Sequence, residues 1–181
     1  MKYFLLLFFL SAGLCAAAEP DHSPDLERIY VEADRQKAMA ALEKNQPGWD
    51  SGNVIHDANS ILGLVALTEG AVEKAKEYLL KAGATPGSPQ LNSFGPPMLL
   101  ARRLVEKGES KVVLEYLDLV GKFWAPVQID PEKLVRADPA MRALLESNKS
   151  QHADELADFK AQVLQGKVPD SWLWRRAPHI F

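Results

Sequence analysis

Residues 59–86 hold two short apolar patterns separated by a glycine, Gly70. Apolar residues recur at steps of three and four positions on both sides of it, as they do on one face of an α-helix. They are Val54, Ala58, Ile61, Leu62 and Val65 before the glycine, and Val72, Ala75, Leu79 and Ala82 after it. Glycine adopts the left-handed conformation that closes a helix, and Glu73 suits the positive end of the next helix dipole. The pattern therefore predicts an antiparallel helical hairpin that turns at Gly70. The two backbones are expected to approach closely at small residues, which are Gly63, Ala66 and Ala75.

A second hairpin is predicted from residues 97–107 and 110–124, with Gly108 at its turn. Apolar residues cover most of the circumference of the 110–124 segment. A helix that is apolar nearly all round is normally buried at the centre of a domain. We therefore expect this helix to lie at the centre of the fold.

The order of small and large residues in both hairpins resembles the tetratricopeptide repeat (TPR), whose unit is a helix-turn-helix of about 34 residues. The first copy is carried by Leu62, Gly63, Ala66, Gly70, Ala75, Leu79, Ala82 and Pro86. The second is carried by Leu100, Ala101, Leu104, Gly108, Val113, Leu117 and Val120. The segment TPGSPQLNSFGP, followed by LEYLDLVGKFW, also resembles sequences in a group of uncharacterised exported bacterial proteins. The TPR resemblance implies an all-α fold of antiparallel hairpins in a right-handed α-α superhelix, with about two repeats plus flanking helices.

The same resemblance implies a groove for a protein or peptide partner, lined by the first helix of each hairpin. Carried over position by position, it assigns partner binding to Asp57, Ser60, Leu64, Thr68, Met98, Arg102 and Glu106. An arginine pair at 102 and 103 suits a bound carboxylate, although a plain surface pair is the more frequent use of such residues.

The beginning of the chain reads as an export signal. Lys2 supplies a positive start, residues 3–14 an apolar run, and residues 16–18 a small-residue cleavage site. The apolar run is shorter than the roughly 20 residues that span a bilayer. We therefore expect residues 1–18 to be a cleaved signal peptide rather than a membrane anchor, which predicts a periplasmic or secreted protein with no stable membrane span after cleavage.

The chain contains one cysteine, Cys15, inside this signal. Lipidation there is the less favoured alternative, because Leu14 is bulky where lipoprotein signals carry a small residue. A chain cleaved after Ala18 has no cysteine, which excludes disulfides, thiolate metal sites and a cysteine nucleophile.

Residues 19–52 are predicted to form an N-terminal helix and a turn, residues 53–125 the double hairpin, and residues 126–181 the C-terminal helices and a packed tail. Ser23 and Pro24 are a cap and first-turn pair, so the first helix should run to about residue 45. Its inner face is expected at Leu26, Ile29, Tyr30, Ala33, Lys37, Ala40 and Ala41. Trp49 is expected to cover one end of the core, in preference to stacking on a ligand.

Two Asp-Pro pairs predict helix starts in the C-terminal part. They give a helical turn at 132–135, a helix at 139–147 and a final helix at 150–165 that ends at Gly166. The final helix should turn Leu156, Phe159 and Val163 inward. The tail is rich in large apolar residues and is expected to pack back on the helices, with docking on a partner or envelope surface as the alternative. These residues are Trp172, Leu173, Trp174, Ile180 and Phe181.

Residues 83–97 form an unusually long connection, rich in glycine and proline. We interpret it as a rigid strap that buries Leu91 and Phe94, with Pro96 and Pro97 starting the next helix. A recognition loop is the minority interpretation, since loops of this length are often functional. Such a loop would present Gln90, Asn92 and Ser93.

Composition and motifs point away from several classes of function. The 181 residues carry 21 Lys and Arg against 24 Asp and Glu, a net charge of −3, so a broad basic surface for nucleic acid is not expected. The four histidines lack helical metal spacing, and no phosphate loop or hydrolase elbow occurs in the sequence. We therefore predict no catalytic residues, no cofactor and no metal.

Two hypotheses of function follow. The first is an exported TPR-like interaction or scaffold module of the bacterial envelope, without catalysis. The alternative is a small exported enzyme or ligand-binding protein with a polar site between His56 and the 83–97 loop.

Overall fold

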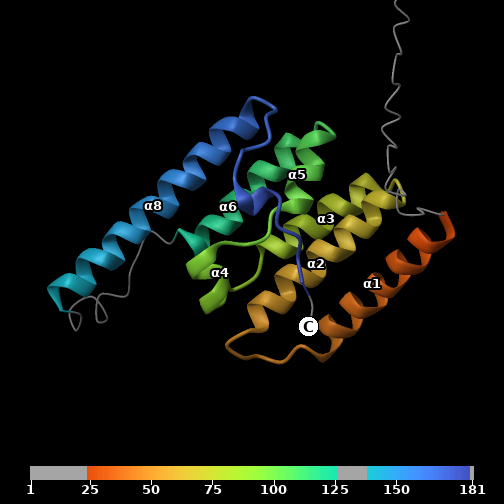
Figure 1. The fold of residues 1–181 in the computed structure, drawn as a ribbon, viewed down its shortest axis with the longest axis horizontal. Coiled ribbons are helices and arrows are strands. Elements are labelled where there is room, and N and C mark those ends of the chain that lie inside the picture. The colour runs from red at the N-terminus through yellow and green to blue at the C-terminus, as the bar shows by residue number, and fades with distance from the viewer. Residues whose placement is uncertain (1–23, 126–137, 180–181) are drawn as a thin grey trace, which may run out of the picture.

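The computed structural model describes residues 24–125 and 138–179, without the side chains of 24–31, 144–146 and 148–150. Within these ranges the fold is all-helical, as predicted (Figure 1). The helices are α1 (Pro24–Lys44), α2 (Ser51–Thr68), α3 (Val72–Gly83), α4 (Pro89–Phe94), α5 (Leu99–Glu106), α6 (Ser110–Trp124), α8 (Pro139–Leu164) and the 3-10 helix η1 (Trp172–Trp174). The predicted signal peptide, the Ser23 cap, the 132–135 turn, Ile180 and Phe181 lie outside the described residues.

Helices α2 and α3 form the first predicted hairpin, and its turn is closed as expected. Gly70 has φ +75°, and the hydrogen bond from the Ala71 N–H to the Ala66 carbonyl, 2.8 Å long, caps α2. Gly108 after α5 and Gly166 after α8 close their helices with the same pattern. The three helix ends predicted from these glycines are therefore confirmed.

One small residue of this hairpin has a different role from the one expected. A Cβ at Gly63 would come within 2.3 Å of the Leu100 side chain, on α5. Gly63 therefore makes room for the neighbouring hairpin rather than for α3, whereas Ala66 and Ala75 are buried in the core.

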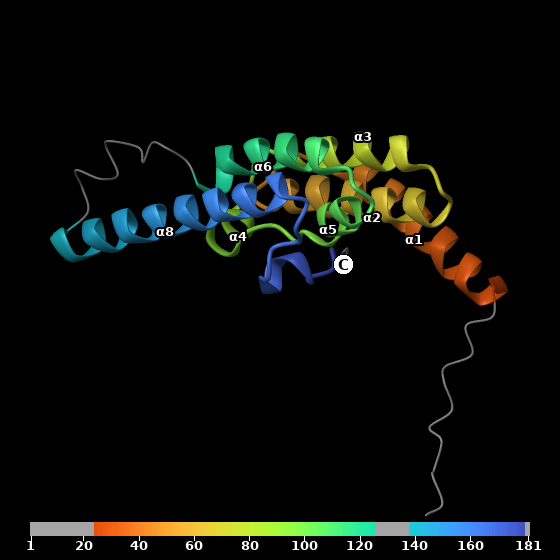
Figure 2. The ribbon, with the colours of Figure 1, turned by 90° about the horizontal axis from the view of Figure 1, so that it is seen from above.

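The helices form two layers. Figure 2 shows α3 and α6 side by side in one layer and α2, α4 and α5 in the next, with η1 on the outer side of that second layer. Helix α6 contacts α3, α4, α5 and α8, and most of its apolar residues are buried. The central position predicted for this helix is confirmed.

The strap contains the short helix α4, capped by the Ser88 hydroxyl, which accepts from the Leu91 N–H at 3.1 Å. The Thr85 hydroxyl donates to the Gly52 carbonyl at 2.9 Å, and the Ser88 hydroxyl donates to Asn53 Oδ1 at 2.6 Å. A Cβ at Gly52 would lie 1.9 Å from the Gly87 carbonyl oxygen, so the strap backbone rests directly on the start of α2. These contacts agree with a rigid strap.

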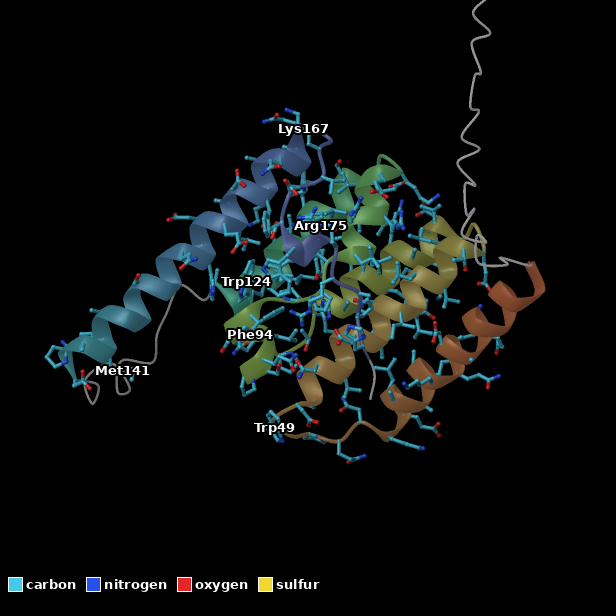
Figure 3. The ribbon with its side chains drawn as sticks, viewed as in Figure 1. Trp49, Phe94, Trp124, Met141, Lys167 and Arg175 are labelled. Atoms are coloured by element: carbon cyan, nitrogen blue, oxygen red, sulfur yellow. The ribbon has the colours of Figure 1, made fainter. Side chains whose placement is uncertain are left out.

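Two large side chains expected to be covered are exposed. Leu91 is buried, but Phe94 is 63% exposed and Trp49 is 75% exposed; in Figure 3, Trp49 lies at the lower edge of the view and Phe94 lies beside α4. A Cβ at the next residue, Gly95, would lie 2.8 Å from the Trp124 ring and 3.1 Å from Leu173, so the core beside this part of the strap is filled by those two side chains. Trp49 has no core end to cover, because the strap already closes that end against Gly52.

Helix boundaries differ from the expectation at two places. Helix α5 begins at Leu99, two residues later than Pro97, because Pro96 and Pro97 are buried in the strap. The two helices expected at 139–147 and 150–165 are one helix of 26 residues, α8. Residues 147–150 contain neither Gly nor Pro, and the modest helix propensities of Ser and Asn do not break a long helix.

Helix α8 starts at the predicted cap, where the Asp138 carboxylate accepts from the Met141 N–H at 2.9 Å. Its first half extends away from the other helices in both views (Figure 1, Figure 2), and its second half packs on α6. Leu156, Phe159 and Val163 are buried there, as predicted.

The chain then turns back, and Leu173 and Trp174 enter the core. The Trp174 ring meets the Phe159 ring edge-on, with 5.6 Å between their centroids. The Trp124 ring stacks on the same Phe159 ring, with 6.2 Å between centroids. The neighbouring Trp172 stays 55% exposed.

Helix α1 packs on α2 through a face one position away from the one expected. Ala38 is fully buried against Ala58 and Leu62, with Leu42 beside them, whereas Ala33 and Lys37 are exposed. Among the described residues α1 makes most of its contacts with α2, through a narrow alanine contact, and an alanine-rich pattern does not determine which way such a helix is rotated.

Candidate interaction groove

The structure separates the seven predicted groove residues into three environments. Ser60 and Met98 are buried, and Asp57 is largely covered. Leu64 and Thr68 line a cleft. Arg102 and Glu106 pair with each other on the surface of α5. The seven residues therefore do not form one continuous open groove.

The cleft that holds Leu64 and Thr68 lies between α1, α2 and the tail, and its volume is about 350 Å³. Helix α1 contributes Asp34 and Lys37 to it, and the tail contributes residues 177–179. Helix α2 contributes Ile61, Leu64, Val65 and Thr68.

The lining has an apolar floor and a charged rim. Ile61, Leu64 and Val65 give side chains without hydrogen-bonding groups, while Asp34 and Lys37 are exposed on the α1 side. The Thr68 hydroxyl donates to the Val65 carbonyl at 2.7 Å, which leaves its oxygen as an acceptor toward the cleft. Such a lining suits an apolar side chain held by a polar backbone, as in a bound peptide segment.

Sequence reasoning missed the contributions of α1 and the tail to this cleft. Lys37 was expected on the inner face of its helix and lies at the rim instead. The apolar composition of the tail predicted that it packs back on the helices, but residues 177–179 contain no periodic pattern that would indicate a return to α2.

Asp57 stands at the end of a buried hydrogen-bond chain. His56 Nδ1 lies 2.8 Å from Asp57 Oδ1, and His56 Nε2 lies 3.0 Å from the Tyr116 hydroxyl. With the proton on Nδ1, the imidazole donates to Asp57 and accepts from Tyr116. Burial raises the pKa of Tyr116 above its ordinary value, and the nearby charge of Asp57 raises it further. These hydrogen bonds link α2 to α6.

The alternative hypothesis placed a polar site between His56 and the 83–97 loop, and His56, Thr85 and Ser88 are all buried and hydrogen-bonded. The His56 side chain is fully buried and both of its ring nitrogens are hydrogen-bonded. Thr85 and Ser88 of the loop are buried as well and hold the strap to α2. These groups build the core and do not line the cleft.

The chain's own tail lies on the face formed by α2 and α5. The Met98 N–H donates to the Leu173 carbonyl at 2.9 Å, at the start of α5. The Arg176 guanidinium lies 3.5 Å from the Gly95 carbonyl, and the His179 N–H donates to Asp57 Oδ2 at 3.3 Å. Two residues assigned to the groove, Met98 and Asp57, are therefore already hydrogen-bonded to the tail.

Arg102 and Glu106 form an ion pair one helical turn apart, with 2.8 Å between Arg102 Nε and Glu106 Oε1. Arg103 lies 3.2 Å from the other carboxylate oxygen. The hydrogen bond from Arg102 lowers the pKa of the Glu106 carboxyl, against a smaller opposing effect of burial and with a further contribution from Arg103. The arginine pair is thus engaged by Glu106.

Among the described residues, no helix is long and apolar enough to cross a bilayer. The same part of the chain has no group of three or more His, Cys, Asp and Glu side chains placed to hold a metal ion. Comparison with protein-family models, with curated proteins and with solved structures returned no match, so no activity or partner is transferred from a relative.

Proposed function

We propose that this protein is an exported, TPR-like protein–protein interaction module of the bacterial envelope. It binds an extended segment of a partner protein along α2, in the cleft between α1, α2 and residues 177–179. The proposal includes the finer fold expectation, a right-handed α-α superhelix of about two repeats.

The observation that carries the proposal is the position of the cleft. It opens on the first helix of a hairpin, which is the side of the repeat expected to bind partners, and the tail of the chain is hydrogen-bonded beside it. The two-layer arrangement, with α2 and α5 in one layer and α3 and α6 in the other, is the arrangement that stacked hairpins give (Figure 2).

The proposal is tested by blocking the cleft without disturbing the fold. Thr68 is exposed and its hydroxyl bonds only within its own helix, so Thr68→Trp fills the cleft while leaving the core unchanged. The matched control is Lys111→Trp, at an exposed position of α6 in the other layer. The tagged full chain and both variants are incubated with envelope extract.

We expect the full chain and Lys111→Trp to retain the same partner, and Thr68→Trp to lose most of it. Recovery of no protein above background, or equal recovery with all three chains, would contradict the proposal.

A further inference from the structure

The tail that lies on the α2–α5 face has two parts with different packing. Leu173 and Trp174 form an anchor, because both are buried and the Leu173 carbonyl accepts a hydrogen bond of 2.9 Å. Residues 177–179, here called the latch, follow the anchor, and two of them, Ala177 and His179, are exposed. Only Pro178 of the latch is buried.

The bonds that hold the latch are long compared with those of the anchor. Its hydrogen bond to the body, from the His179 N–H to Asp57 Oδ2, measures 3.3 Å. Arg176, just before it, reaches the Gly95 carbonyl at 3.5 Å and otherwise bonds and stacks locally, 5.2 Å above the Trp172 ring. Segments with few buried apolar contacts and weak hydrogen bonds open at a small fraction of the global unfolding free energy.

The latch lines the cleft, and it also bonds a carboxylate that the cleft lining does not include. The lining joins residues 177–179 to Asp34 and Lys37 of α1, while the His179 N–H donates to Asp57 Oδ2 and Asp57 Oδ1 faces His56. A peptide that takes the place of the latch therefore finds an acceptor in Asp57.

We propose that the latch opens about the fixed anchor and gives up its place beside α2 to an extended peptide that continues from the cleft and donates an N–H to Asp57. The inference rests on the proposed function in one respect: the peptide that displaces the latch in the cell is a segment of the partner protein. The opening itself is a property of this chain and is measurable without a partner.

The experiment places a nitroxide on the latch in the full chain. Cys15→Ser removes the chain's own cysteine, and Ala177→Cys supplies the labelling site at an exposed latch position. A synthetic peptide with the sequence of residues 175–181, RRAPHIF, is then titrated as a competitor. Because a tethered segment acts at an effective concentration of the order of millimolar, the titration extends to several millimolar. A scrambled peptide and a label at Ala161→Cys, exposed on α8, are the controls.

We expect the mobile component of the spectrum at position 177 to rise severalfold and to saturate with RRAPHIF, with no change for the scrambled peptide or at position 161. An unchanged spectrum at 177, or an equal change with the scrambled peptide, would overturn the proposal. Neither result affects partner retention by the cleft, so failure here is distinguishable from failure of the proposed function.

A second variant tests the same contact without a peptide. In Asp57→Asn the amide oxygen still accepts from His56, while its NH₂ group faces the His179 N–H and cannot accept from it. We expect a larger mobile component at position 177 than in the matched Asp154→Asn chain, whose carboxylate is exposed on α8. Equal spectra for the two variants would show that Asp57 does not hold the latch.

Discussion

At the scale of single residues, the structure turns apparent functional candidates into core groups. From the sequence, a polar site between His56 and the 83–97 loop was the alternative hypothesis of function. The fold instead buries His56 between Asp57 and Tyr116, which is 60 positions away in the chain. No local pattern announces a partner so distant, and for that reason the role of this histidine was not predictable.

The His56–Tyr116 hydrogen bond leads to a prediction about stability. Tyr116→Phe leaves the buried His56 Nε2 without its partner, which should lower the free energy of unfolding by about 1–3 kcal/mol. His56→Ala should also destabilise the fold, since it empties a fully buried position. Urea unfolding followed by circular dichroism measures both losses. A Tyr116→Phe chain as stable as the original would show that the bond contributes nothing to the core.

The Glu106 ion pair gives a prediction of pH dependence. Since the folded pKa lies below the unfolded value of 4.5, the pair stabilises the fold above that pH, and its contribution disappears as the pH falls through the folded pKa. The side chain is about a third exposed, so Glu106→Gln should cost less than about 1 kcal/mol at neutral pH.

The cost of Glu106→Gln is measured by urea unfolding at neutral and acid pH, with Glu115→Gln, an exposed glutamate on α6, as control. A cost for Glu106→Gln that grows toward acid pH would contradict the assignment.

At the scale of elements, glycine signals and helical spacing predicted the hairpins, α6 and the second half of α8 well, but not the buried face of α1. The α2–α3 hairpin, the central position of α6 and the inward residues of α8 follow from periodicity, because a misplaced register would expose an entire apolar face. The connections were less predictable. Phe94 in the strap and Trp49 in the turn before α2 were expected to be covered, and both are exposed, because a connection has no periodic pattern that tells which of its side chains face the core.

The tail anchor gives a prediction at this scale. Trp174 is fully buried against Phe159, so Trp174→Ala should lower the free energy of unfolding by about 3–5 kcal/mol. Trp172 is half exposed and contributes mainly its contact with Arg176, so Trp172→Ala should cost less than about 1 kcal/mol. Paired urea unfolding curves test this difference. Similar losses for the two tryptophans would show that the tail is not a structural part of the core.

At the scale of the whole molecule, the resemblance to stacked hairpins predicted the helical class, but not that the chain's own tail lies on α2 and α5. The groove residues were assigned as if both first helices were open, whereas the tail lies on Met98 and Asp57 and leaves the cleft at Leu64 and Thr68. Long-range return of a terminal segment depends on tertiary packing, which a repeat pattern does not encode. The cleft is therefore lined by α2, which was predicted, and by α1 and residues 177–179, which only the fold brings to it.

The central claim is that a partner binds at the cleft and nowhere else on the two layers. Its most direct test is photocrosslinking in intact bacterial cells, with a benzophenone amino acid placed one position at a time at Thr68, at Lys37 and, as controls, at Lys111 and Ala161. We predict one crosslinked species of the same mass from Thr68 and Lys37, and none from the two controls. Crosslinks of equal yield from Lys111 or Ala161, or none from Thr68, would contradict the account.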